Sequence, residues 1–171
     1  MLIFLFFTSC SKQDDSIPEG PDLSEAGHPR ILLLEGEEKQ IRDLIDSDET
    51  WKKMHLAILE KSTGLLGKPV LERVMTGRRL LSVSREALKR IFYLSYSYRM
   101  TGDERYLTKA DEEILAVSRF EDWNPSHFLD VAEMTMAVAI GYDWLFEDLS
   151  ERARLEARSA ILTKGINESK S

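Results

Sequence analysis

Apolar residues recur at spacings of three and four through almost all of the chain that follows His28. This period places them on one side of an α-helix, whereas no segment shows the alternation of a half-buried strand. We therefore predict an all-α fold. The first expected helix spans 37–46, the second begins at Thr50 and breaks at Gly64, and the third begins at Ser84 and ends at Gly102. A fourth helix follows directly after Gly102. The last two are expected at 125–146 and at 150–163, where Ser150 begins the helix.

Side-chain and backbone preferences predict how these helices begin and end. Thr50 and Ser84 are suitable N-caps, because a hydroxyl can accept a hydrogen bond from a free backbone N–H. Asn124 followed by Pro125 predicts an N-cap and the first helical residue. Gly102 favours the left-handed conformation that ends a helix. Because the turn at Gly102 is short, we expect the helices on either side to lie antiparallel.

Two of the amphipathic helices have a predicted apolar face. We expect these faces to consist of Trp51, Met54, Leu56, Ile58 and Leu59 in the second helix, and of Leu155, Ala157, Ala160 and Ile161 in the last. Such faces pack against neighbouring helices.

The segment 122–144 differs from the rest because it is apolar nearly all round the helical wheel. A helix without a polar side is normally buried. It nevertheless carries His127, Asp130, Glu133 and Asp143, and buried ionisable groups are costly unless they are paired or used. This combination is typical of the inner wall of a cavity.

Five residues near the start of this segment are candidates for binding a sugar: Trp123, Asn124, His127, Asp130 and Glu133. A tryptophan ring can stack on a sugar, while amide and imidazole groups bond its hydroxyls. The last three residues follow at steps of three, so they share one broad helix face. The amino terminus of the helix favours an anionic group such as a uronate.

The same segment also has a structural interpretation. Trp123 can fill the core, Asn124 can act only as a cap, and His127 can bond Asp130 or a backbone carbonyl. Asp143, in the run GYDWLF, can hold the helix against its neighbour. The sequence does not choose between the two interpretations.

The amino-terminal residues indicate export. Residues 1–10, MLIFLFFTSC, form an apolar run that ends at the single cysteine, Cys10, and resemble a bacterial lipoprotein signal in which that cysteine is acylated. Residues 11–27 are polar and contain proline and glycine, which predicts a flexible tether. We expect the folded part to span 28–171, and the protein to be an outer-membrane lipoprotein facing the periplasm or the cell surface.

The chain has 171 residues and a formal net charge of −7. This acidity argues against a general nucleic-acid-binding protein, which needs a basic face. The densest basic cluster comprises Arg78, Arg79, Arg85, Lys89 and Arg90; it predicts either a local groove for an anionic polymer or a solvated helix face with ion pairs. The histidines lack a metal-ligand spacing and no phosphate-binding glycine loop is present, so we expect no metal and no cofactor.

Three blocks occur in the order found in a known family: HPRILL at 28–33, TGRRLLSVSREALKRIFYLSYSYRMTGDERYL at 76–107, and DWNPSHFLDVAEM followed by IGYDWL within 122–145. They extend over most of 28–165 and resemble the amino-terminal helical domain of the heparinase II/III family of polysaccharide lyases, in particular its heparinase II branch in Bacteroidetes. The resemblance implies the first hairpins of an incomplete α/α toroid, followed by β-sandwich domains in full-length members.

The resemblance also implies an activity: cleavage of uronic-acid-containing polysaccharides, such as heparin, heparan sulfate or related glycosaminoglycans, by β-elimination. This reaction requires neutralisation of the uronate, removal of the C5 proton and protonation of the departing 4-oxygen. The family's main catalytic tyrosine and histidine are expected beyond Ser171, so His127 is assigned to the carboxylate-holding or subsite set. The chain is therefore expected to be an inactive fragment of a parent enzyme, which can be a homodimer.

Two alternatives remain from the sequence. A glycoside hydrolase on a similar helical barrel would need two carboxylates, for which Asp130 and Asp143 are available. Thirteen residues place them about 220° apart on the helical wheel, which argues against such a pair. The other alternative is a non-catalytic lipoprotein that binds glycan at the cell surface.

Overall fold

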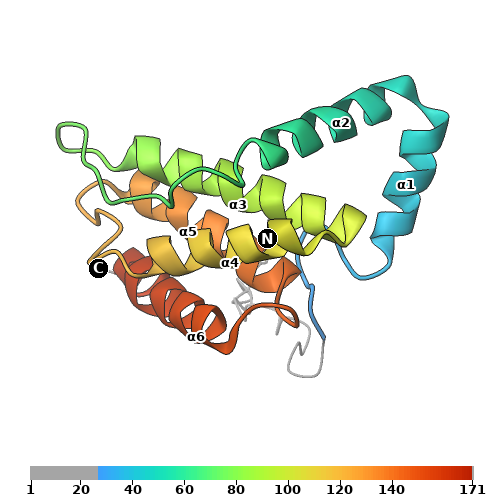
Figure 1. Cartoon of the computed structure of the whole chain (residues 1–171). Coiled ribbons are helices and arrows are strands. Elements are labelled where there is room, and N and C mark those ends of the chain that lie inside the picture. Colours follow the sequence, from blue (N-terminus) through green and yellow to red (C-terminus); the bar gives the residue numbers. More distant parts are fainter. Residues whose placement is uncertain (1–26, 171) are drawn as a thin grey trace, which may run out of the picture.

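The computed structural model describes residues 27–170, which form a helical bundle with a projecting arm (Figure 1). The described residues contain six α-helices and no strand, so the all-α prediction is confirmed. The helices are α1 (Glu37–Ser47), α2 (Glu49–Thr63), α3 (Leu81–Thr101), α4 (Glu104–Ser118), α5 (Phe128–Trp144) and α6 (Glu151–Ala160). A π-helical turn, Ile161–Ile166, and a 3-10 turn, Glu168–Lys170, follow α6.

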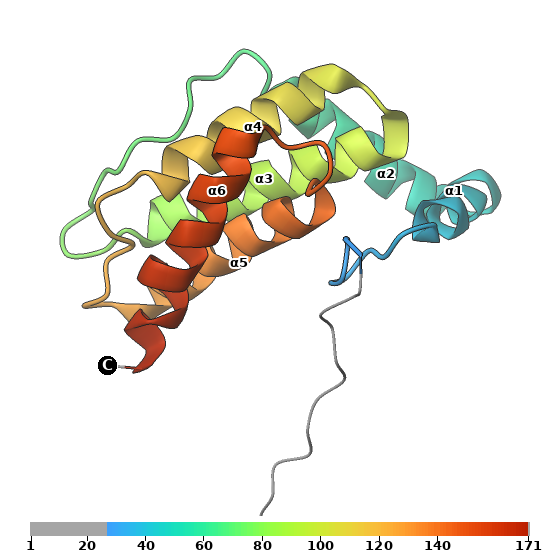
Figure 2. The same ribbon diagram turned by 90° about the horizontal axis from the view of Figure 1, so that it is seen from below.

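Helices α3 and α5 lie side by side and run in the same direction. Near their amino-terminal ends, Asp130 of α5 accepts a 2.6 Å hydrogen bond from the backbone N–H of Leu80. Farther along, the ring centroids of Phe92 and Trp144 lie 5.2 Å apart. Helix α4 packs against both α3 and α6 (Figure 2). Consequently, the amino-terminal ends of α3 and α5 meet at one end of the bundle.

The structure confirms some of the predicted helix ends. Gly102 ends α3 with a φ of 71°, the left-handed conformation expected there. Ser150 caps α6 by accepting a 3.1 Å bond from the backbone N–H of Ala153. Both ends depend on residues adjacent in sequence, which is why a local pattern could predict them.

Three predicted caps are wrong. Helix α2 is capped by Asp48, whose carboxylate accepts bonds from two backbone N–H groups, including that of Thr50. Helix α3 begins at Leu81, and Ser84 lies buried within it. Helix α5 begins at Phe128, so neither Asn124 nor Pro125 starts it. In the last two cases, contacts with residues distant in sequence determine where the helix begins.

The core of α5 is continuous with that of α3 and α4. Gly141 allows this close packing, because a Cβ at that position would lie 2.6 Å from side-chain atoms of both Ile91 and Ile114.

The expectation that α5 is buried on every side is only partly right. Phe128, Leu129 and Met136 remain about half exposed, so one apolar side of α5 is open to solvent in the described part of the chain.

Two predicted apolar faces also differ from the structure. In α2, the side chains of Trp51, Met54 and Leu56 are exposed, because the arm formed by α1 and α2 extends away from the bundle (Figure 1). In α6, Leu155 is 58% exposed. The predicted Ala157 and Ala160 are buried as expected, and Ala153, which was not predicted, joins them on the buried side of α6.

A buried group of charges connects α3, α4 and the segment that follows α2. The fully buried carboxylate of Glu113 accepts bonds from Arg90 at 2.9 Å and from the backbone N–H of Leu71 at 3.1 Å. Lys109 lies 3.2 Å from the same carboxylate. Arg90 also donates to the carbonyl of Pro69 at 2.9 Å. This group holds the long connection between α2 and α3 against the bundle.

The predicted lipid-modified Cys10 and most of the predicted tether, residues 11–26, lie outside the described residues. None of the helices within 27–170 combines the length and apolar character that crossing a membrane requires.

Candidate functional site

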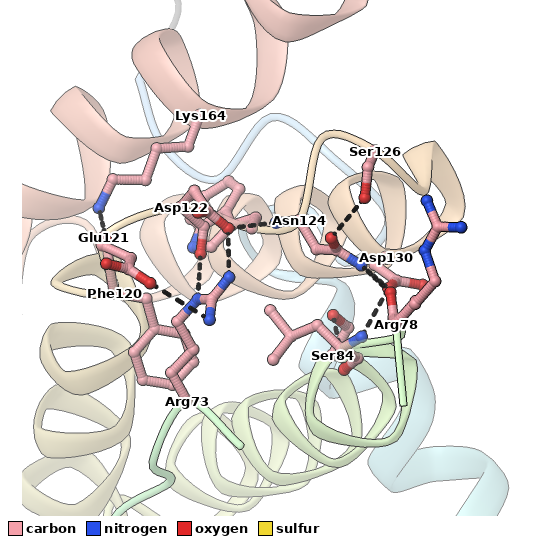
Figure 3. Close-up of polar contacts among 12 residues, drawn as sticks. Arg73, Arg78, Ser84, Phe120, Glu121, Asp122, Asn124, Ser126, Asp130 and Lys164 are labelled. Carbon is pink, nitrogen blue, oxygen red and sulfur yellow. Dashed lines mark hydrogen bonds and ion pairs between the residues drawn. The ribbon is translucent and has the colours of Figure 1, made fainter. Parts of the chain in front are cut away.

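The segment entering α5 is held by a network of polar side chains (Figure 3). Asn124 adopts a positive φ of 63°, a conformation that asparagine tolerates better than most residues. Its backbone N–H donates to Asp122 at 2.7 Å, and its side-chain oxygen accepts a bond from Ser126 at 2.8 Å. Its side-chain amide donates to the carbonyl of Arg78 at 2.9 Å. Asn124 is therefore buried and engaged in structural bonds rather than facing solvent.

Asp130 is the central acceptor of this network. Its fully buried carboxylate accepts bonds from Asn124 at 2.7 Å, from the backbone N–H of Leu80 at 2.6 Å and from Arg79 at 3.0 Å. Burial raises the pKa of Asp130, but the bonds from Arg79, Asn124 and Leu80 outweigh this effect and hold the pKa below its ordinary value. Asp130 thus joins the beginning of α5 to the beginning of α3.

A second ion pair fixes the same segment from the other side. Arg73 donates to the Asp122 carboxylate at 2.6 Å and lies 3.3 Å from Glu121. Burial raises the pKa of Asp122, whereas the bonds from Arg73 and from the backbone of Asn124 lower it by more. The connection between α2 and α3 and the segment before α5 therefore support each other (Figure 3).

Trp123 has no exposed surface, and its indole N–H donates to the carbonyl of Val117 at 3.0 Å. A ring buried on both faces offers no platform to a sugar. The suggestion that Trp123 stacks on substrate is therefore wrong for this conformation, and the core-filling interpretation holds.

His127 is the candidate with an available polar atom. It occupies the N-cap position of α5, and no side chain caps that helix. Its Nδ1 lies 2.5 Å from the carbonyl oxygen of Ser126. Because a carbonyl only accepts, Nδ1 carries the proton, and in the neutral ring Nε2 bears the lone pair. No residue within 27–170 bonds to Nε2.

The predicted basic cluster is largely neutralised by ion pairs. Arg85 pairs with Glu133 at 3.1 Å, so this candidate carboxylate is also occupied. The other paired members are Arg79 with Asp130, Lys89 with Glu86, and Arg90 with Glu86 and Glu113. Arg78 is exposed, and its guanidinium has no ion pair within the described residues.

Asp143 and His28 form a contact that the sequence did not predict. Nδ1 of His28 lies 2.7 Å from the Asp143 carboxylate, which also accepts bonds from the backbone N–H groups of Arg30 and Ile31. The His28 ring stacks on Phe146 with a centroid distance of 3.9 Å. Asp143 thus holds the segment before α1, rather than a neighbouring helix. Separations of 112 to 115 residues explain why local patterns could not reveal the contact.

The structure also bears on the suggested pair of hydrolytic carboxylates. Asp130 and Asp143 lie at opposite ends of α5, about 20 Å apart along its axis at 1.5 Å per residue. A glycoside hydrolase needs its two carboxyl groups within roughly 10 Å. Both carboxylates are also occupied by structural bonds, so this pair does not form a hydrolase site.

What remains at the beginning of α3 and α5 is a candidate site for an anion, which we call the amino-terminal corner: Arg78, His127 and the first turn of α5. The uncapped N–H groups of a helix amino terminus favour negative charge. Arg78 adds a cation and His127 a hydrogen-bonding nitrogen. Within 27–170, no group of three or more His, Cys, Asp or Glu residues is arranged to hold a metal ion.

A scan against models of protein families finds no match to this sequence, and a search of curated proteins finds no similar sequence either.

Proposed function

We propose that this chain belongs to the helical part of a polysaccharide lyase that acts on uronic-acid-containing polysaccharides by β-elimination. The observation that supports the proposal most directly is the amino-terminal corner. His127 is the N-cap residue of α5, which no side chain caps, and the backbone carbonyl of the exposed Arg78 accepts a 2.9 Å bond from Asn124 just before that helix. In this proposal Arg78 and the N–H groups of α5 neutralise the uronate carboxylate, and Nε2 of His127 bonds a neighbouring sugar group. The C5 proton becomes more acidic when the carboxylate charge is neutralised.

The helix arrangement supports an incomplete α/α toroid as the wider architecture. Parallel helices α3 and α5 form one layer, while α4 and α6 pack together behind them. In a toroid, one layer lines the centre and the other forms the outside. The open apolar side of α5, with Phe128, Leu129 and Met136, suits a helix that further hairpins of such a ring would cover.

A second candidate, a non-catalytic glycan-binding protein, is favoured by a specific observation. Asp130 and Glu133, the acidic candidates near the corner, are both paired with arginines. The corner therefore has groups that bind an anion but lacks a free carboxylate that could act as general acid or base. We propose export as a lipoprotein for either candidate, with acylation at Cys10; loss of labelling by a palmitate analogue in Cys10→Ser would support it.

The experiment that separates these functions is a product analysis. The protein is incubated with heparan sulfate, chondroitin sulfate and alginate, and the ultraviolet absorbance of a new C4–C5 double bond is followed. Unsaturated products support the lyase, and saturated products with new reducing ends would indicate a hydrolase. Binding without turnover fits both a glycan-binding protein and the inactive helical part of a lyase, and the same assay on the full-length parent then separates these two.

A further inference from the structure

A cavity of about 500 Å³ lies where the end of α2 meets the middle of α3. Three lysines line it: Lys61 from the last turn of α2, Lys68 from the following segment, and Lys89 from α3. Tyr93 of α3 forms part of the wall. Its volume is within the range of pockets that bind small ligands.

The charges around this cavity are not balanced. Lys61 and Lys68 have no carboxylate within 4.0 Å among residues 27–170. Lys89 pairs with Glu86 on its own helix. Glu60 is the acidic residue that lines the cavity. Lys61 and Lys68 thus add positive charge without an ion pair in a protein of net charge −7, and the repulsion between them falls when an anion enters.

The exposed side of α3 connects this cavity with the amino-terminal corner. Arg85, Lys89 and Tyr93 follow at steps of four residues, which places them along one side of the helix. Leu81 and Lys89 are eight residues apart, or about 12 Å along the axis. A linear polymer that carries an anion on each repeat can therefore contact both places.

We propose that the cavity lined by Lys61, Lys68 and Lys89 binds sulfate or carboxylate groups of an anionic polysaccharide, as a second site distinct from the corner. Tyr93 contributes a hydroxyl that can bond the same anion or a sugar hydroxyl. The concave wall favours a single chain over a membrane surface, which requires a flat contact with apolar side chains. The inference depends on the proposed function for the nature of the polymer, but it rests on different residues.

The test is a binding titration of the full chain with a heparin-derived hexasaccharide. The double variant K61Q/K68Q is compared with K52Q/K53Q, which removes the same charge from α2 outside the cavity. Charge-assisted contacts predict about a tenfold weaker affinity for K61Q/K68Q and less than a twofold change for the control. Equal losses in both variants would overturn the proposal, because non-specific attraction would then account for binding.

Two further measurements use the unmodified protein. Bound hexasaccharide should protect Lys61 and Lys68 from acetylation in preference to Lys52 and Lys53; uniform protection would contradict the site. Stronger binding to anionic phosphatidylglycerol vesicles than to hexasaccharide would also contradict it, since the anion would then belong to a lipid. R78Q distinguishes the two proposals: it should lower the affinity for hexasaccharide at the corner, whereas saturating hexasaccharide should still protect Lys61 from acetylation.

Discussion

The carboxylate of Asp130 in α5 accepts a 2.6 Å bond from the backbone N–H of Leu80, fifty residues earlier in the chain. Leu80 is the N-cap residue of α3, and no local side chain caps that helix. Asp130 therefore supplies from another helix the negative charge that a helix amino terminus favours. This contact joins the first turn of α5 to the start of α3, next to the amino-terminal corner.

Replacing Asp130 with Asn should destabilise the fold. The amide cannot satisfy Arg79 and Leu80 together as the carboxylate does, and about 2 kcal/mol should be lost, since Arg79 is partly solvated. Urea unfolding gives this value. Glu133→Gln is the matched control, with a change below about 1 kcal/mol because its partner Arg85 is exposed. Similar losses in both variants would contradict the central role of Asp130.

The Asp130 carboxylate also predicts that the stability of the protein falls at acid pH. Because the pKa of Asp130 is lower in the folded protein than its ordinary value of 3.8, its contribution to stability is present above 3.8 and disappears as the pH falls through the folded value. The free energy of unfolding should therefore decline below 3.8, and decline less in D130N. Parallel pH profiles for the two proteins would refute this assignment.

Glu113→Gln should destabilise the bundle more than any substitution of an exposed acidic residue. It leaves Arg90 and Lys109 buried without their shared anion, at a cost of about 3 kcal/mol. Glu112→Gln, one residue away and exposed, should change stability by less than about 1 kcal/mol. Thermal unfolding of the two variants side by side makes the comparison; equal melting temperatures would show that burial of Glu113 is unimportant.

Gly141→Ala tests the close approach of α5 to its neighbours. The added methyl would lie 2.6 Å from Ile91 and Ile114, so overpacking should cost about 1–3 kcal/mol. Gly67→Ala serves as the control, because nothing lies within 4 Å of its added Cβ. Denaturant unfolding should show a loss for the first variant alone. An unchanged stability of G141A would mean that α5 is packed less tightly than the structure indicates.

Local sequence patterns predicted the helices of this fold better than the positions at which some of them begin. The left-handed Gly102 and the cap at Ser150 depend on neighbouring residues and were predicted correctly. Asn124 was assigned as a cap because its type and the following proline suit that role. Its amide instead bonds Asp130 and the carbonyl of Arg78, and the helix begins later. No local rule contains that long-range contact.

The candidate site illustrates the same limit. The sequence selected residues that gather at one end of α5, but it could not tell which of them would be engaged by the fold. Trp123 and Asp130 are buried, whereas His127 retains an available nitrogen. Arg78, which belonged to an undivided basic cluster in the sequence, becomes distinct only when the ion pairs of its neighbours are known.

The central claim, that the amino-terminal corner binds a uronate, is tested most directly by titrating the protein with a uronate-containing tetrasaccharide. Wild type is compared with R78Q and H127Q, and with R152Q, a matched charge control on α6. We expect R78Q and H127Q each to weaken binding about fivefold to tenfold, as loss of a charge-assisted or hydrogen-bonded contact does, without lowering the unfolding midpoint. An affinity unchanged in R78Q and H127Q, or reduced equally in R152Q, would contradict the account.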